Sequence, residues 1–357
     1  MNIKEKLLRN LKECGQKRRE QGLPGMYRYV SQLLHNLHLK WKIQNIGAQY
    51  SSKFPRKVQI ESSSKCNLSC PACSHARETG NGQHLTLAEL QKILRWLELK
   101  PFSIILSGIG EPLLNPQFFE MVEILSAENI NCEFFTNGTM FTPRINAALL
   151  SCPNIRSIAI SLDGARKNTF ESLRAGADFD RWKLLVCQFV EAAEQRRPLP
   201  ILTSTHTVLA KSNFDEVEEI VLLGAQMGFG RMHFLDLVPV DKVAGSLAMS
   251  DQQCSCVQQR IFEIAKKLKV HVTLDLRRKK IPPETEVRCL YPWDYVMVSV
   301  NGDIRPCPAL FGSDKAPVMG NIFQQDFMTI WTGEQFEDFR KTSAQGTNHF
   351  CNFCPYY

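Results

Sequence analysis

The spacing of apolar residues divides the chain into an N-terminal helical segment and a longer region of alternating strands and helices. Residues 1–53 carry two apolar stripes with helical spacing, and Pro24-Gly25 interrupts the pattern between them. The stripes comprise Ile3, Leu7, Leu8 and Leu11, and then Val30, Leu33, Leu34, Leu37 and Trp41. We predict a helical N-terminal extension whose stripes pack on the rest of the protein.

From residue 54 to residue 250, short apolar runs alternate with amphipathic stretches. The runs predict six strands, at 57–61, 103–107, 131–136, 157–162, 201–208 and 232–237. Helices are predicted between most of them; Thr86 and Glu89 form a capping box, and Asn213 is the expected N-cap of a later helix. This order predicts an α/β fold whose parallel sheet closes, or nearly closes, into a barrel with its chemistry on the loops after the strands.

The remaining residues predict a linking segment and a small module. Residues 251–285 contain a helix, a short strand at 270–274 and a basic, proline-containing stretch at 277–283. In residues 286–357, an apolar run at 295–300 and Ile304 flank Asn301-Gly302, which is a strong β-hairpin signal. We therefore predict four regions, 1–53, 54–250, 251–285 and 286–357.

The positive charge of the chain is concentrated at its N-terminus. The formal net charge is +7, and residues 1–50 alone hold ten Lys or Arg and three Asp or Glu. The balanced remainder argues against specific nucleic-acid binding, whereas the basic helices suggest a weak contact with a membrane surface or an acidic partner. No apolar run is long enough to span a bilayer, and the charged N-terminus lacks an export signal. We expect a cytoplasmic protein.

Thirteen cysteines are many for a cytosolic chain. Disulfides seldom persist in that compartment, so grouped cysteines there indicate metal or redox chemistry. Seven cysteines fall into two groups with ligand-like spacing, which are Cys66, Cys70 and Cys73, and then Cys289, Cys307, Cys351 and Cys354. We interpret the other six as packing residues; they are Cys14, Cys132, Cys152, Cys187, Cys254 and Cys256.

The first group places three thiolates within eight residues, directly after the first predicted strand. Three protein ligands leave one position of a four-ligand site open, and an open iron of a [4Fe-4S] cluster can chelate an outside ligand. The alternative is a zinc site whose fourth ligand lies elsewhere, for example His75. The spacing by itself is compatible with both.

The motifs that follow resemble those of the radical S-adenosylmethionine (SAM) enzymes. The family signature is CxxxCxxC after the first strand of a partial (β/α)6 TIM-like barrel, and Cys66, Cys70 and Cys73 match it. Further motifs stand in the family's order at later strand ends, with SGIGEP at 107–112, TNG at 136–138 and SLDG at 161–164. One departure is Ala72, because the family often has an aromatic residue at that position.

The resemblance implies that the first cysteine group holds a SAM-binding [4Fe-4S] cluster. It also implies a set of residues that contact SAM, namely Gly108, Gly110, Glu111, Asn137, Ser161, Asp163 and Arg174. The glycines would let the backbone approach the methionyl group closely, and Arg174 would pair with the SAM carboxylate.

The second group resembles the C-terminal SPASM domain in its short, single-cluster "twitch" form. Gly302 precedes Cys307 by five residues after the hairpin turn, and Cys351 and Cys354 form a CxxC pair. The resemblance implies four thiolates that close the coordination of a second, auxiliary [4Fe-4S] cluster, which would carry electrons. A structural zinc ion with four cysteine ligands is the alternative. The spacing is most similar to that of radical SAM dehydrogenases that oxidise aminocyclitol alcohols.

The resemblance therefore implies a radical SAM oxidoreductase with SAM and two [4Fe-4S] clusters as cofactors. Reductive cleavage of SAM would give a 5′-deoxyadenosyl radical that abstracts hydrogen from a substrate C–H bond. We expect dehydrogenation of an alcohol-type or carbohydrate-like small molecule, with the second cluster accepting an electron from the substrate. An external donor such as flavodoxin or ferredoxin would supply the electron that reduces the first cluster. The alternatives are a peptide-modifying SPASM maturase (crosslinking, epimerisation or side-chain oxidation) and a zinc-binding, non-enzymatic protein.

The sequence assigns no general base. Asp294 and Tyr295 lie near the expected junction of barrel and module, and His206 and His233 lie in the fifth and sixth predicted strands. We interpret each of the four as a packing or turn residue.

Overall fold

A computed structural model describes residues 30–31, 33–39, 41–43, 54–73, 82–97, 101–237, 242–276, 289–308 and 317–351. The chain divides into two compact units, Met1–Ser52 and Lys53–Tyr357. In the first unit, the described residues between 30 and 43 are helical. Leu39 and Ile43 are buried there, whereas Leu34 and Leu37 of the predicted stripe are exposed. Within the described residues, no helix is long and apolar enough to cross a membrane.

The second unit is built on one sheet whose described strands follow the order β10-β9-β8-β1-β2-β3-β4-β5-β6-β7. The strands from β1 to β7 are parallel, and each pairs with the next in sequence. Their bounds are β1 Lys57–Ile60, β2 Ser103–Leu106, β3 Asn131–Thr136, β4 Ile155–Ser161, β5 Leu202–Leu209, β6 Arg231–Asp236 and β7 His271–Asp275. The six predicted strands are confirmed, and β7, which corresponds to the short strand at 270–274, extends the same sheet.

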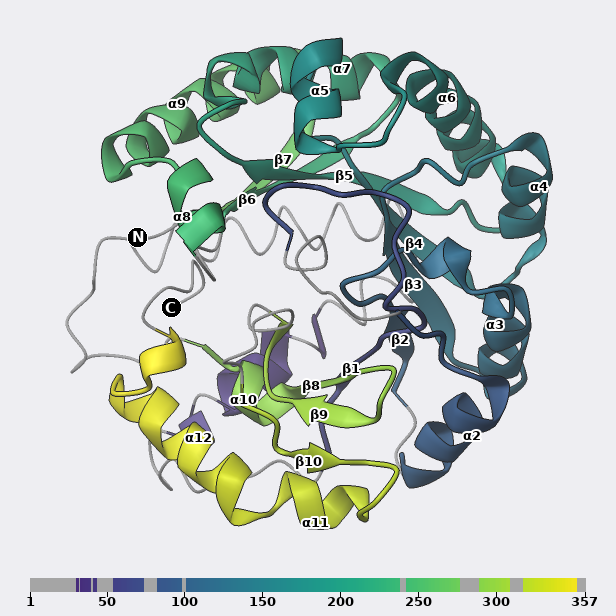
Figure 1. Ribbon diagram of the computed structural model, residues 1–357, viewed down its shortest axis with the longest axis vertical. Helices are drawn as coiled ribbons and strands as arrows, with labels where there is room; N and C mark the ends of the chain where they lie inside the picture. Colours follow the sequence, from purple (N-terminus) through teal and green to yellow (C-terminus); the bar gives the residue numbers. More distant parts are fainter. Residues whose placement is uncertain are drawn as a thin grey trace. The chain divides into compact units, whose positions relative to one another are not determined.

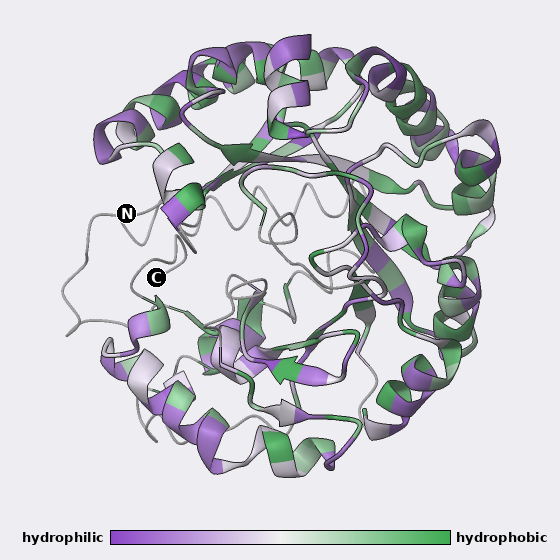
Figure 2. Cartoon of the chain, viewed as in Figure 1, coloured by the Kyte–Doolittle hydropathy of each residue, from purple (hydrophilic) through white to green (hydrophobic). Residues whose placement is uncertain are grey.

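Helices connect the parallel strands and lie around the outside of the curved sheet (Figure 1). They are α2 Leu87–Trp96, α3 Phe118–Ala127, α4 Pro143–Ser151, α5 Lys167–Leu173, α6 Phe179–Gln195, α7 Val217–Gln226, α8 Lys242–Leu247 and α9 Asp251–Leu268, with single 3-10 turns η2 Pro112–Leu114 and η3 Phe214–Glu216. Hydrophobic and hydrophilic residues alternate along these helices, as amphipathic helices require (Figure 2). The predicted α/β partial barrel is confirmed.

The two faces of the sheet have different surroundings because successive strand residues point to opposite sides. On β3, the ring of Phe134 packs on Phe118 of α3, with 5.1 Å between ring centroids, and is buried in the core. The next residue, Phe135, instead packs on His206 of β5 at 4.9 Å. The apolar core therefore lies between sheet and helices, and the inner face is left to other side chains.

The C-terminal module continues the sheet on the other side of β1. Strand β8 (Tyr295–Val298) pairs in parallel with β1, and β9 (Asp303–Arg305) and β10 (Gly320–Asn321) follow as antiparallel strands. The hairpin predicted at Asn301-Gly302 is confirmed, and Gly302 has a φ of +85°, which favours glycine. The remaining elements are α10 Tyr291–Asp294, α11 Phe327–Trp331, α12 Glu334–Gln345 and the 3-10 turn η5 His349–Cys351.

The two expected helix caps have different outcomes. The capping box of Thr86 and Glu89 at the start of α2 is confirmed. Asn213 stands at the N-cap position of η3, as expected, but its side chain makes no capping hydrogen bond to the turn. The physical reason is that its buried amide joins two strand ends: Oδ1 accepts from the N–H of Ala210, and Nδ2 donates to the carbonyls of Asp163 and Val208, all at 2.8–2.9 Å.

Packing is confirmed for most of the ungrouped cysteines. Cys132 and Cys254 are buried, and Cys152 and Cys187 are half-buried. Cys256 is exposed, so the packing prediction is wrong for this residue. Cys254 occupies the buried face of α9, and residues two apart on a helix point in different directions. Cys14 lies outside the described residues.

We predict that Asn213→Ala destabilises the protein by about 2 kcal/mol or more, because it leaves a buried N–H and two buried carbonyls without their partner. Urea unfolding measures the change. Thr86→Ala is the control: it removes an exposed cap and costs about 1 kcal/mol. A loss of less than about 0.5 kcal/mol for Asn213→Ala would contradict the bridging role.

Candidate functional site

The three cysteines of the first group lie on the loop that follows β1. All three side chains are half-buried, and the N–H of Cys73 donates to the carbonyl of Cys70 at 3.0 Å. Burial raises the pKa of the Cys66 and Cys70 thiols, and the neighbouring thiols raise the pKa of Cys66 further. Metal binding displaces the protons of such thiols and so converts them to thiolate ligands.

Two side chains, one from the end of β3 and one from the end of α5, point donors at these thiols. Asn137, after β3, places Nδ2 at 3.9 Å from the Sγ of Cys66 and at 3.0 Å from the side-chain oxygen of Asn67. Arg174 places a guanidinium nitrogen 4.0 Å from the Sγ of Cys70. Donors of this kind stabilise thiolate ligands, so the surroundings fit a metal-bound form of the loop.

Arg174 is itself positioned by Asp163, which follows β4. The Nε of Arg174 lies 2.6 Å from an Asp163 carboxylate oxygen, and the other Asp163 oxygen accepts from the N–H of Val208 at 2.7 Å. Burial disfavours the Arg174 charge, but Asp163 and Cys70 outweigh it and raise the pKa of Arg174. The structure thus brings Arg174, Asp163 and Cys70 together, and pairing of Arg174 with the SAM carboxylate stays a prediction. Ser161 lies nearby, paired in register with His206 of β5.

Glu111 is buried beneath the cysteine loop instead of facing open space. Its carboxylate accepts from the backbone N–H of Asn137 at 2.7 Å, from the Thr136 hydroxyl at 2.8 Å and from the N–H of Leu113 at 3.3 Å. Burial raises its pKa to about 7, although these donors oppose the shift. The carboxylate therefore joins the ends of β2 and β3, and any contact of this segment with SAM falls to its backbone.

The glycines of the SGIGEP motif allow the protein's own backbone to approach closely. A Cβ on Gly110 would lie 2.4 Å from the carbonyl oxygens of Ser63 and Lys65, and one on Gly108 would lie 2.2 Å from the Glu61 side chain. Because the space beside Gly110 is filled by the strand-end segment before Cys66, we revise the reason for this glycine. It lets two strand ends pack, and SAM contact through its backbone stays a prediction.

Glu61 is a residue that the motif comparison missed. It is buried at the end of β1, and its carboxylate accepts from the N–H of Ile109 at 2.9 Å and from the N–H of Val300 at 3.1 Å. Gln59, two residues earlier, donates to the carbonyl of Ser107 and accepts from the Tyr295 hydroxyl. The sequence signal was present, because polar residues at alternate positions of an otherwise apolar strand, K-V-Q-I-E, mark a second, functional face.

A row of polar side chains lines the inner face of β5, β6 and β7. His206 and His233 have ring centroids 5.0 Å apart, and Nε2 of His233 lies 3.0 Å from the Asp275 carboxylate while Nδ1 contacts the Thr273 hydroxyl. Burial, with help from His233, lowers the pKa of His206 to about 3, so the imidazole is neutral. We call His206, His233, Thr273 and Asp275 the inner polar row.

The other two residues considered as bases are packed. Tyr295 is buried and its hydroxyl donates to Gln59, and Asp294 is buried at the end of α10. The packing interpretation is confirmed for Tyr295 and Asp294. It does not describe His206 and His233 fully, because both histidines face the inner side of the sheet.

The second cysteine group lies in the C-terminal module. Cys307 is buried, and Cys289 and Cys351 are half-buried. The Sγ of Cys289 accepts from the N–H of Tyr291 at 3.4 Å, and the Sγ of Cys351 lies 3.7 Å from the Ser343 hydroxyl. Burial raises the pKa of Cys351. Cys354 lies outside the described residues, as does His75 of the zinc alternative.

The described thiols have neighbours that suit metal-bound sulfur. Across the part of the chain that the structure describes, no three His, Cys, Asp or Glu side chains converge on one point. The weak donors beside Cys66, Cys70 and Cys351 also suit sulfur ligands.

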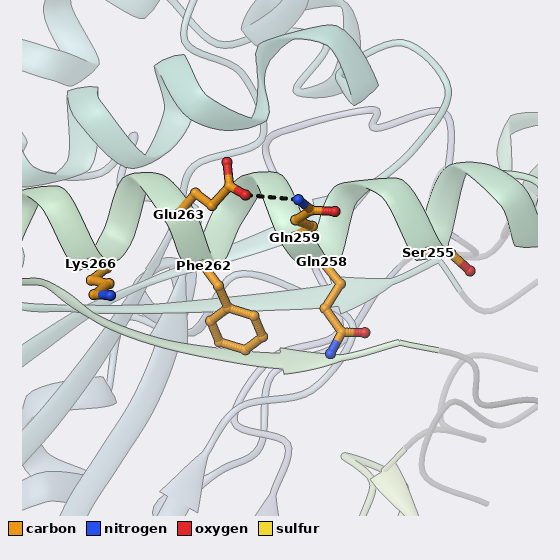
Figure 3. Close-up of a pocket in the computed structure, with 6 residues that line it drawn as sticks. All are labelled: Ser255, Gln258, Gln259, Phe262, Glu263 and Lys266. Carbon is orange, nitrogen blue, oxygen red and sulfur yellow. Dashed lines mark hydrogen bonds between the residues drawn. The ribbon is translucent and has the colours of Figure 1, made fainter.

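A surface hollow of about 450 Å³ lies away from these groups, along α9 (Figure 3). Its lining residues are Ser255, Gln258, Gln259, Phe262, Glu263 and Lys266. They all belong to one helix, and Gln259 donates to Glu263 at 2.8 Å. Because binding sites bring together polar groups from several elements, we assign no function to this hollow.

Comparison with known protein families agrees with the motifs. Residues 60–224 match the radical SAM superfamily, and residues 289–355 match the SPASM iron–sulfur cluster-binding domain. The first match runs from the last residue of β1 into α7, and the second spans the module with the second cysteine group.

Similar proteins are named for different reactions. The chain is 27% identical over 329 residues to an AdoMet-dependent heme synthase of Methanosarcina barkeri, covering 85% of this chain and 89% of that protein. It is 23% identical over 299 residues to a PqqA peptide cyclase of Bradyrhizobium diazoefficiens, covering 81% and 76%. The crystal structure of Streptococcus suis SuiB bound to S-adenosylmethionine superposes with a TM-score of 0.65 at 16% identity, covering 98% of this chain and 81% of SuiB, and so shares the fold.

We predict that Gly110→Ala lowers the iron content and SAM affinity of the anaerobically reconstituted protein. The new Cβ would lie 2.4 Å from two backbone oxygens, so the segment before Cys66 must move. Gly230→Ala is the matched control, since nothing lies within 4 Å of its Cβ. Iron analysis and SAM titration measure the effect. Equal iron and SAM binding in the two variants would show that the cysteine loop tolerates the shift.

We also predict a pH dependence of stability that originates in Glu111. Because its pKa rises from 4.5 to about 7, the folded protein holds a proton that the unfolded chain releases between these pH values. The free energy of unfolding of the iron-free protein therefore falls as pH rises through this window, by up to about 1.4 kcal/mol per unit. Urea unfolding at pH 5 to 8 should show a shallower slope for Glu111→Gln, and an unaltered slope for the exposed control Glu120→Gln. Parallel slopes in all three proteins would refute this assignment.

Proposed function

Because the chain belongs to the radical SAM superfamily and ends in a SPASM domain, we propose that it dehydrogenates an alcohol-type or carbohydrate-like small molecule. When bound, SAM and the cluster on Cys66, Cys70 and Cys73 supply one-electron chemistry that takes hydrogen from a substrate C–H bond. The backbone at Gly108 and Gly110, with Asn137, Ser161, Asp163 and Arg174, is proposed to hold SAM. Glu111 would act indirectly, by fixing the position of the Asn137 backbone.

The observation that carries the proposal is the fusion of the two cysteine-bearing regions through β1. Strand β1 pairs with β2 on one side and with β8 on the other, and Glu61 joins the loop after β2 to the turn after β8. A shared strand holds an auxiliary cluster in a fixed place relative to the barrel. We propose that a second [4Fe-4S] cluster on Cys289, Cys307, Cys351 and Cys354 accepts the electron left on the oxidised substrate.

The inner polar row supports a hydroxylated substrate. His206 is neutral and half-buried, and His233 is held by Asp275 and Thr273. Neutral imidazole nitrogens donate to or accept from hydroxyl groups, which makes the row a suitable wall for a polar small molecule. Loss of a hydrogen atom, a proton and an electron from an alcohol carbon and its hydroxyl gives a carbonyl, and the low pKa of His206 leaves that imidazole to bind the hydroxyl as a neutral hydrogen-bond partner.

A peptide substrate is the second candidate. The PqqA peptide cyclase is similar to this chain over most of its length, and its name assigns it a peptide. A maturase of this type would crosslink, epimerise or oxidise side chains. The zinc-binding, non-enzymatic alternative loses its support, because both cysteine groups fall in matches to iron–sulfur protein families.

We propose a cytoplasmic location and an external electron donor such as flavodoxin or ferredoxin. A reducing compartment keeps the ligand thiols free, and none of the described cysteines forms a disulfide. Contact of residues 1–50 with a membrane surface or an acidic partner is a further proposal. It rests on the net charge of +7 in that segment.

We predict separate roles for the two cysteine groups. Reconstituted protein should bind about eight irons, and the triple variant Cys66, Cys70 and Cys73→Ala should keep about half. The double variant Cys351→Ala and Cys354→Ala should lose the second cluster, still form 5′-deoxyadenosine with a strong reductant, and yield much less oxidised product. Candidate alcohols and peptides are screened by 5′-deoxyadenosine release.

Cys70→Ala is the control for this experiment, since it should abolish both 5′-deoxyadenosine and product. Circular dichroism must show that the double variant keeps its fold. Full product yield from a folded double variant without the second cluster would exclude an electron-accepting role and favour a redox-neutral reaction. Zinc without iron in the anaerobic protein would contradict the proposed function altogether.

A further inference from the structure

Arg340 of α12 is a buried cation inside the C-terminal module. Its side chain is 0% exposed, and the guanidinium carbon lies 4.3 Å from the centroid of the Trp331 ring and 4.8 Å from that of Phe336. Burial lowers its pKa to about 10, so the side chain still carries its charge at neutral pH. Charged arginines are seldom fully buried without a partner anion.

The hydrogen bonds of this guanidinium are incomplete. Its Nε donates to the carbonyl of Pro292 at 2.9 Å, but both terminal nitrogens are buried without a hydrogen-bond acceptor among the described residues. A buried donor without a partner costs about 1–3 kcal/mol, and more when the group is charged. Two such donors on one cation therefore indicate an acceptor beyond the described residues.

The position of Arg340 identifies the kind of acceptor. The residue is tied to Pro292, which lies three residues after Cys289, and Ser343, one turn further along α12, contacts the Sγ of Cys351. Arg340 thus connects the two segments that carry these cysteines. An auxiliary cluster has sulfide and thiolate sulfurs that accept hydrogen bonds, and it becomes more negative on reduction.

We propose that Arg340 is a positioning and tuning residue whose terminal N–H groups donate to the auxiliary iron–sulfur cluster and raise its reduction potential. The inference rests on the proposed function, because it requires a cluster on the second cysteine group. A nearby positive charge stabilises the reduced cluster more than the oxidised one, since the reduced cluster carries one more negative charge. The acceptor of the substrate electron would then be easier to reduce.

The test measures the potential of the auxiliary cluster alone. The full chain with Cys66, Cys70 and Cys73 changed to alanine serves as parent, so that one cluster remains, and its midpoint potential is measured by anaerobic titration followed by electron paramagnetic resonance. We expect Arg340→Gln to lower the equilibrium constant for reduction at least tenfold, which is about 59 mV for one electron. Arg260→Gln is the matched control, because Arg260 also lies over an aromatic ring, that of Phe214, but outside the module.

The outcomes separate this inference from the proposed function. A parent without iron contradicts the proposed function. A folded, iron-loaded Arg340→Gln with the parent's potential overturns the tuning role. If Arg340→Gln loses its iron, Arg340→Met decides by the same criterion. If both variants lose their iron, Arg340→Lys decides. A midpoint potential near that of the parent then supports the role of the charge. Loss of iron from Arg340→Lys indicates a structural role for Arg340 and overturns the proposal.

Discussion

The buried carboxylate of Glu61 is the contact on which the arrangement of the site depends. It stands at the end of β1, immediately before the segment that leads to Cys66, and its two oxygens accept one N–H from the SGIGEP loop and one from the turn of the C-terminal hairpin. A buried carboxylate without these donors would carry a large desolvation cost, so the carboxylate and its two partners must assemble together. Three chain segments that are far apart in sequence are thereby held at one corner of the barrel.

The cysteine loop is held by backbone contacts, one just before Cys66 and one between Cys66 and Cys70. The N–H of Glu111 donates to the carbonyl of Lys65 at 2.8 Å, and the N–H of Ser69 donates to the carbonyl of Ala175 at 2.9 Å, next to Arg174. The missing side chain of Gly110 lets the first of these segments pack against the loop after β2. A cluster that binds SAM through one open iron needs its ligands presented in a fixed arrangement, and these backbone contacts supply it before any metal arrives.

Electrostatics divide the interior of the protein into two kinds of site. Around the cysteines, cations and amides face sulfur: Arg174 at Cys70, Asn137 at Cys66 and, by our proposal, Arg340 at the auxiliary cluster. Along the inner face of β5 to β7, the neutral His206 and the pair of His233 and Asp275 offer hydrogen bonds without a large net charge. The first arrangement suits electron-rich clusters, and the second suits an uncharged, hydroxylated molecule.

The sequence by itself determined the six strands, the hairpin at Gly302 and both cysteine groups, because these features depend on local periodicity, turn chemistry and ligand spacing. It did not determine what Asn213, Glu111 and Gly110 do, although their positions were noticed. Their partners, Val208, Asn137 and the carbonyl of Ser63, come from other strands. The partners of Glu61 come from other segments as well, so the polar pattern of its strand did not reveal them, and no pattern marked Arg340. Only the tertiary structure decides which buried polar groups meet, because their pairing is set by strand register and packing between segments that no local pattern connects.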